Sequence, residues 1–123
     1  MDTRTLKYIS ENQLSSCMNN TKWKELVDEF TSIEGYEPLV NIKLIFDAGN
    51  NNTFSQVWWE EVERDGFELI EWMQIKPFEI EKSASLIEQK LTDYTEVLKK
   101  GLDKHNIEYH YENEAFTIYG YKR

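Results

Sequence analysis

The stretch Phe54–Pro77, FSQVWWEEVERDGFELIEWMQIKP, holds three of the chain's four tryptophans and a dense set of acidic side chains. Asp65-Gly66 lies between two runs that contain apolar residues. This dipeptide favours the type I′ turn of a β-hairpin, because both central residues of that turn need positive φ. The sequence therefore predicts two antiparallel strands joined at Asp65-Gly66 and placed centrally in a sheet.

Two registers of this hairpin are open. With a two-residue turn, Glu60 faces Glu71 and the Trp59 side chain lies opposite Trp72. A three-residue loop with a bulge instead places Trp58 opposite Trp72. In either register large rings lie on both faces, because adjacent residues of a strand point to opposite sides.

The clearest helix is predicted for the segment from Asn19 or Asn20 to about Ile33. Its apolar residues recur at i, i+3, i+4, i+7 and i+10, which is the spacing of one helical face. Asn19 or Asn20 can cap the first free amides, and Gly35 suits a left-handed residue at the end. The predicted inward stripe is Trp23, Leu26, Val27, Phe30 and Ile33.

A second helix is predicted from Asp93, which with Glu96 resembles a capping box, to a left-handed Asn106. Residues 2–11 fit a further short helix with Leu6 and Ile9 on one side. The inward stripe of the second helix is predicted to be Tyr94, Val97, Leu98, Leu102 and His105.

Three further strands are predicted from alternation of apolar and polar residues. They are residues 39–46, with Val40, Ile42, Leu44 and Phe46 on one face, residues 107–111, and residues 115–121 after a turn near Asn113. Residues 47–53 are predicted to be a polar loop. Residues 78–91 fit neither period and are predicted to be a loop with at most one turn of helix.

This order groups helices and strands instead of alternating them. It predicts the α+β class, with a mainly antiparallel sheet of about five strands packed by two to three helices. The length of 123 residues suits one domain over residues 1–123, in which residues 1–17 are a candidate helical N-terminal extension.

The charge narrows the classes of partner. Twenty-three acidic residues against 14 basic ones give a net charge of −9. Nucleic acid and anionic membranes are not expected as partners, because phosphate binding needs a basic face that the chain lacks. A basic protein partner is favoured by electrostatic steering. The alternative is that the charge only keeps the protein soluble.

The sequence predicts a cytoplasmic location. No apolar run approaches the roughly 20 residues that span a bilayer, and residues 1–17 have no apolar core of the signal-peptide type. Cys17 is the single cysteine, so neither an intramolecular disulfide nor a cysteine-based metal site is expected.

Catalytic signatures are sparse, and we predict no catalytic residue, metal site or cofactor. Glu60 and Glu71, if opposed across the hairpin, would raise the pKa of one carboxyl and suit acid–base catalysis. Like charges also face each other on solvated strands without any chemistry. His105 and His110 stand in no nucleophile or metal-ligand signature, and the five glycines form no phosphate loop.

The aromatic and acidic hairpin is the remaining candidate for a binding surface. Tryptophan is a common interface anchor, and acidic neighbours suit a basic partner. The alternative is that the tryptophan on the second face of the sheet, Trp58 or Trp59, is covered by the N-terminal segment or by residues 78–91. The candidate binding residues are Trp58, Trp59, Glu60, Glu61, Glu71 and Trp72.

Three segments, Leu14–Leu26, Leu69–Pro77 and Ile118–Tyr121, carry a resemblance. They resemble a bacterial family of uncharacterised small proteins, and the likeness runs in order over nearly the whole chain. Members of that family have a Met-Asn-Asn-Thr-Lys-Trp stretch, here Met18–Trp23, and an Ile-Glu-Trp strand, here Ile70–Trp72. The resemblance implies a bacterial origin and a single domain, and no reaction.

Two functions from different classes follow as hypotheses. The first is a non-enzymatic protein-binding module of the immunity or antitoxin kind, which occludes a basic protein. The alternative is a small hydrolase or ligand-binding domain that uses Glu60, Glu71 and His110. The first is favoured, because the second lacks a nucleophile or a metal-ligand set. The sequence does not predict the oligomeric state.

Overall fold

The computed structural model describes residues 3–47, 53–82 and 89–122, and for residues 79–82 and 89–91 it describes the backbone alone. The helices within these ranges are α1 (Thr3–Glu11), α2 (Asn20–Thr31), α3 (Trp59–Asp65) and α4 (Thr95–Lys104), with a 3-10 turn η1 at Phe67–Leu69. The strands are β1 (Ser15–Ser16), β2 (Val40–Leu44), β3 (Ile70–Ile75), β4 (Phe78–Lys82), β5 (Gln89–Asp93), β6 (His110–Glu112), β7 (Ala115–Tyr119) and β8 (Tyr121–Lys122).

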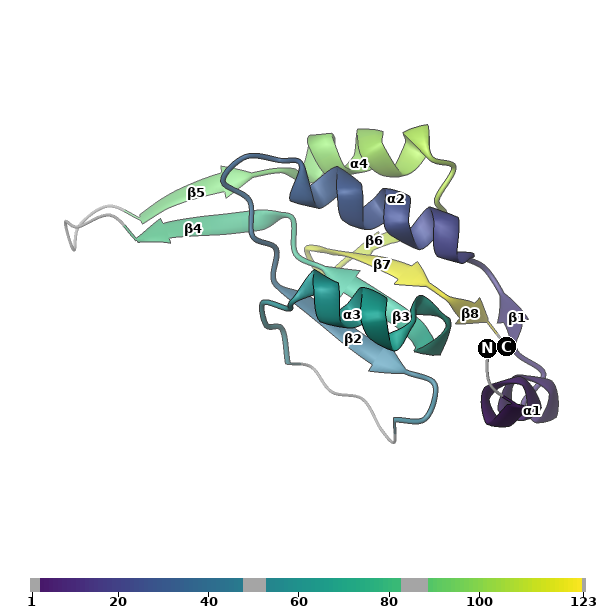
Figure 1. Cartoon of the computed structure of the whole chain (residues 1–123). Helices are drawn as coiled ribbons and strands as arrows, with labels where there is room; N and C mark the ends of the chain where they lie inside the picture. Colours follow the sequence, from purple (N-terminus) through teal and green to yellow (C-terminus); the bar gives the residue numbers. More distant parts are fainter. Residues whose placement is uncertain (1–2, 48–52, 83–88, 123) are drawn as a thin grey trace.

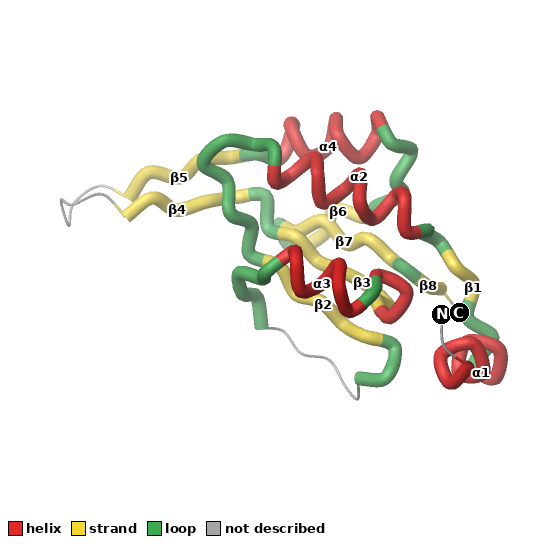
Figure 2. Tube along the Cα trace, in the orientation of Figure 1, coloured by secondary structure: helices red, strands yellow, loops and turns green. Residues whose placement is uncertain are grey.

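A central antiparallel sheet, in the strand order β2-β3-β7-β6, carries the fold. Helices α2 and α4 lie side by side over this sheet, and α3 lies in front of β2 and β3 (Figure 1). Two small antiparallel sheets pair β1 with β8 and β4 with β5 (Figure 2). The predicted α+β class with a mainly antiparallel sheet is confirmed, and the central sheet has four strands among the described residues.

Helix α2 confirms its prediction. The Asn19 side chain caps it by accepting a hydrogen bond from the Lys22 backbone N–H at 2.8 Å. The helix ends at Thr31, so Ile33 lies beyond it and is half-buried. Gly35 has the predicted positive φ of +77°, although it stands in the loop after the helix.

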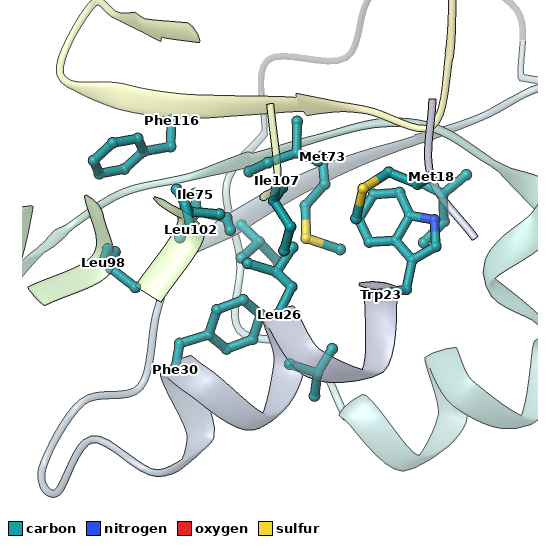
Figure 3. Close-up of a cluster of buried hydrophobic side chains, with 14 of the residues drawn as sticks. Met18, Trp23, Leu26, Phe30, Met73, Ile75, Leu98, Leu102, Ile107 and Phe116 are labelled. Carbon is teal, nitrogen blue, oxygen red and sulfur yellow. The ribbon is translucent and has the colours of Figure 1, made fainter. Parts of the chain in front are cut away.

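The main core lies between the two long helices and the sheet. Its members from α2 include Trp23, Leu26 and Phe30, and Phe30 has no exposed surface. Figure 3 shows these side chains meeting those of α4 and the strands in one cluster. The members of this core from the sheet, from α4 and from the residues after α4 include Met73, Ile75, Leu98, Leu102, Ile107, Phe116 and Ile118.

The hairpin predicted at Asp65-Gly66 is wrong. Trp59–Asp65 form helix α3, and β3 pairs with β2 and β7, so neither predicted register exists. Gly66 has φ +100° at the end of α3, and its N–H donates to the Val62 carbonyl at 3.1 Å. The glycine thus ends a helix, and the Glu- and Arg-rich run before it favours helix over strand.

The loop predicted for residues 78–91 is also wrong in part. Phe78–Lys82 and Gln89–Asp93 form the antiparallel pair β4–β5, which extends away from the central sheet (Figure 1). Pro77 separates this pair from β3. Each strand has only five residues. A window across the whole segment therefore mixes two strands with the residues between them, and no single period emerges.

Strand β2 is shorter than predicted, and its face changes near its end. The register of the β2–β3 pair shifts between Lys43 and Leu44, at a β-bulge. Beyond this shift Ile45 is buried, whereas Leu44 and Phe46 are exposed. The alternation predicted for residues 39–46 fails because a bulge reverses which residues point to the core.

The C-terminal half needs smaller corrections. The N-cap of α4 is Tyr94 and not the predicted Asp93. The Asp93 carboxylate still accepts a hydrogen bond from the Thr95 backbone N–H at 2.9 Å. Val97 is half exposed instead of inward. The predicted strand at residues 107–111 begins only at His110.

Residues with positive φ occur at the predicted end of the second helix and at the predicted turn near Asn113. Asn106 has φ +55°, and Asn113 and Glu114 have φ +54° and +60°. Glu112 pairs with Ala115, so the two residues between them form a two-residue turn of the type I′ kind. The turn predicted near Asn113 is confirmed. No helix in the described ranges is both long and apolar enough to cross a membrane.

Candidate functional site

Trp58 is the most exposed large hydrophobic side chain in the described chain, with 79% of its surface accessible. It is the N-cap residue of α3 and makes no side-chain capping bond. The next residue, Trp59, is half-buried and packs against Phe30, with 4.8 Å between the ring centroids. Two adjacent tryptophans thus have opposite environments, one against the core and one in solvent.

Two open grooves meet at Trp58. The Pro38 groove has a volume of about 720 Å³ and is lined by Thr31, residues 33–38 and residues 56–59. The Val62 groove has a volume of about 530 Å³ and is lined by residues 56–58, Glu61, Val62 and Asp65. Because residues 56–58 belong to both linings, Trp58 stands between the grooves. We call these two grooves and Trp58 the Trp58 surface.

Every charged side chain that lines the two grooves is acidic. Glu34 and Glu37 line the Pro38 groove, and Glu61 and Asp65 line the Val62 groove. Among the described residues, only Asp65 of these four has a basic group nearby, the Arg64 Nε at 3.9 Å. Glu37 accepts a hydrogen bond from the Gln56 side chain at 3.1 Å. The Trp58 surface therefore has a negative potential beside an exposed indole.

The six predicted binding residues do not form one site. Trp58, Trp59 and Glu61 line the grooves of the Trp58 surface. Glu60 is exposed on α3 but lines neither groove. Glu71 lies in β3 and forms an ion pair with Lys43, whereas Trp72 pairs with Lys43 and Tyr119 in the sheet. Glu60 and Glu71 are therefore not opposed, and the carboxylate pair expected from the hairpin does not form.

Three acidic residues of the Trp58 surface were absent from the sequence prediction. Glu34 and Glu37 follow α2, and Asp65 ends α3. Asp65 lies seven residues after Trp58 along α3, a spacing that points to one helical face but not to one face of the predicted hairpin. For Glu34 and Glu37, the approach to Trp58 depends on how the segment after α2 packs beside α3. No local pattern of residues predicts this second contact, so only the folded chain reveals it.

A different acidic cluster lies between α2 and α4, which we call the α2–α4 junction. His105 Nε2 lies 2.7 Å from Glu29 Oε1, and His105 Nδ1 lies 3.1 Å from Glu25 Oε2. The Lys104 ammonium lies 3.5 Å from the same Glu29 oxygen. The hydrogen bond from His105 is the main cause that holds the pKa of Glu29 below its ordinary value, and burial opposes it.

Two features of the described residues bear on catalysis: their potential metal ligands and the cleft beside Cys17. No group of three His, Cys, Asp or Glu side chains among them is placed to hold a metal ion. Cys17 and His110 line a small cleft together with Glu108, Tyr119 and Lys122. Its volume of about 10 Å³ is close to that of one water molecule and is too small for an organic substrate.

The sequence profile of a family of unknown function, DUF6678, matches residues 5–123. The match covers nearly the whole chain, so the chain belongs to this family. No curated protein and no solved structure matches it.

Proposed function

We propose that this member of the DUF6678 family is a non-enzymatic protein-binding module that binds a basic protein through the Trp58 surface. One observation carries the proposal: an indole that is 79% exposed stands between two grooves whose charged side chains are all acidic. Exposed aromatic rings in such grooves are typical anchors of interfaces, and the acidic rim would steer a basic partner.

The kind of partner follows from charge and size. A net charge of −9 on 123 residues suits a small protein that covers a basic surface of another protein. This is how immunity proteins and antitoxins act, and we propose that class here, with the bacterial origin and cytoplasmic location that it requires. The alternative hydrolase has lost its main support, because Glu60 and Glu71 are not paired.

The test begins with affinity capture from the native cell, at low and at moderate salt, with identification of the bound proteins. The captured protein is then purified and titrated with the wild type and with Trp58→Ala. Loss of an anchor at the centre of an interface typically costs 2 kcal/mol or more, so binding should weaken by about 30-fold. Val97→Ala, at a half-exposed apolar position on α4, is the control.

Two results would contradict the proposal. One is that no basic protein is recovered at either salt concentration. The other is a purified complex whose affinity is the same with Trp58→Ala as with the wild type, which would place the interface elsewhere. The immunity assignment has its own test: co-expression of the chain should suppress the toxicity or activity of the partner, and Trp58→Ala should reduce that protection.

A further inference from the structure

Three other aromatic rings of the described residues lie under cations of the chain itself. The Arg4 guanidinium lies 4.5 Å from the centre of the Phe46 ring, and the Lys76 ammonium lies 4.6 Å from the centre of the Phe54 ring. The Lys122 ammonium lies 5.6 Å from the centre of the Tyr119 ring. Trp58 is more exposed than any of these three rings, and no cation of the described residues lies over it.

We infer that the Trp58 surface receives an arginine side chain of the basic partner, with the guanidinium stacked on the Trp58 indole and hydrogen-bonded to groove carboxylates. This inference rests on the proposed function and specifies its chemistry. Tryptophan is the ring that binds cations best, and the interaction strengthens when solvent is excluded. The acidic side chains in reach are Glu34 and Glu37 on one side and Glu61 and Asp65 on the other.

The arrangement suits arginine better than lysine. A guanidinium is planar and weakly hydrated, so it can stack on an indole and still donate two parallel hydrogen bonds to a carboxylate. An ammonium is compact and strongly hydrated, and it approaches a carboxylate as a point charge. Val57 and Val62, which are half-buried beside Trp58, offer apolar surface to the methylene groups of the side chain.

Other occupants fit less well. A second copy of this chain would bring another acidic protein of net charge −9 against four carboxylates. A small ligand usually occupies an enclosed, mainly apolar cavity, whereas both grooves are open and carry acids along their walls. An extended basic segment can cross Trp58 and lie in both grooves, because the two grooves share residues 56–58.

The experiment compares two synthetic peptides of equal length and charge, one with arginine and the other with lysine at every basic position. Each is titrated into the full chain labelled with ¹⁵N, and the indole N–H signals are followed by NMR. The Trp58 signal is assigned by its loss in Trp58→Leu. We expect the arginine peptide to shift this signal and to bind about three- to tenfold more tightly than the lysine peptide.

Two variants separate the ring from the charge. Trp58→Leu should remove the preference for arginine and leave a weaker, salt-sensitive affinity for both peptides. Glu61→Gln, in the Val62 groove, should weaken the arginine peptide about two- to fivefold. Glu60→Gln is its matched control, because it makes the same charge change at the neighbouring exposed position of α3, outside both grooves.

Several outcomes overturn the inference. These are equal binding of the two peptides, a preference for lysine, an arginine preference that survives Trp58→Leu, or no binding of either peptide. None of them decides the proposed function, which depends on whether the captured partner needs Trp58. If that partner binds through Trp58 while the peptides show no preference, the arginine inference fails alone. If the partner does not need Trp58, the proposed function itself fails.

Discussion

The α2–α4 junction and the Trp58 surface are both acidic, and they differ in what faces the acids. At the junction, Glu25 and Glu29 each lie within hydrogen-bond distance of a ring nitrogen of His105. On the Trp58 surface, Glu34 and Glu61 have no basic side chain of the described residues within ion-pair distance, and the ring between them is in solvent.

This difference separates acids that are paired within the chain from acids that, under the proposed function, face a partner. Carboxylates satisfied inside the chain contribute to stability, because removing their partner leaves charge without compensation. Carboxylates that face solvent contribute little to stability and set the electrostatic field instead. Substitutions at the junction should therefore change the free energy of unfolding, and substitutions on the Trp58 surface should change binding.

The largest effect on stability is expected in the main core, for Leu102→Ala in α4. Leu102 is 2% exposed and packs in the main core from α4, so its truncation should lower the free energy of unfolding by about 2 to 5 kcal/mol. Urea denaturation followed by circular dichroism measures this change. Val97→Ala, half exposed on the same helix, should cost less than about 0.5 kcal/mol. Equal losses would show that α4 does not pack as described.

The next effect is expected at His105→Ala. The substitution removes the imidazole from both carboxylates of the junction and leaves Lys104 as the basic neighbour of Glu29, so we expect a loss of about 1 to 2 kcal/mol. The same denaturation assay measures it at neutral pH. His110→Ala is the matched control, because His110 is exposed in β6 and should cost less than about 0.5 kcal/mol. If His105→Ala lowers the free energy of unfolding no more than His110→Ala does, the junction does not stabilise the fold.

A smaller effect is expected from the pH dependence of Glu29. Its pKa in the folded chain lies below the ordinary value of 4.5, so the folded state binds the proton less readily than the unfolded state. The resulting stability is fully present above pH 4.5 and is lost as the pH falls through the folded pKa. The stability difference between the wild type and Glu29→Gln should therefore shrink below pH 4.5. Asp93, whose pKa is also lowered, is common to both proteins and cancels. A difference that stays constant with pH contradicts the assignment.

Much of the fold was predictable where a local pattern and the packing agree. Four of the five residues of the predicted α2 stripe are buried, all but Ile33, and Asn19 caps the helix. The failures come from signals that two structures share. A glycine with positive φ fits a hairpin turn and a helix end equally, so Asp65-Gly66 was misassigned, whereas Asn113-Glu114 does form a two-residue turn. In the first case the Glu- and Arg-rich run favours helix, and Trp59 of α3 packs on Phe30, a residue far away in sequence.

The candidate site was predictable only in its chemistry. An exposed tryptophan among acids follows from two adjacent rings in an acidic run, and Trp58, Trp59 and Glu61 line the Trp58 surface. Glu71 and Trp72 were grouped with them only through the hairpin, and they lie in the sheet beside Lys43. Glu34 and Glu37 reach the surface through tertiary packing, for which the sequence has no periodic or spacing signal.

The smallest effect on stability is expected at Trp58→Leu. The ring is 79% exposed, and neither Trp nor Leu offers an oxygen to cap α3, so the free energy of unfolding should change by less than about 0.5 kcal/mol. Trp59→Leu is the matched variant, since it makes the same substitution one residue later. It removes a ring packed against Phe30 and should cost about 1 to 2 kcal/mol. Circular dichroism follows both, because the substitutions alter tryptophan fluorescence. If Trp58→Leu destabilises the chain as much as Trp59→Leu, the exposed indole supports the fold, and its exposure no longer argues for a partner.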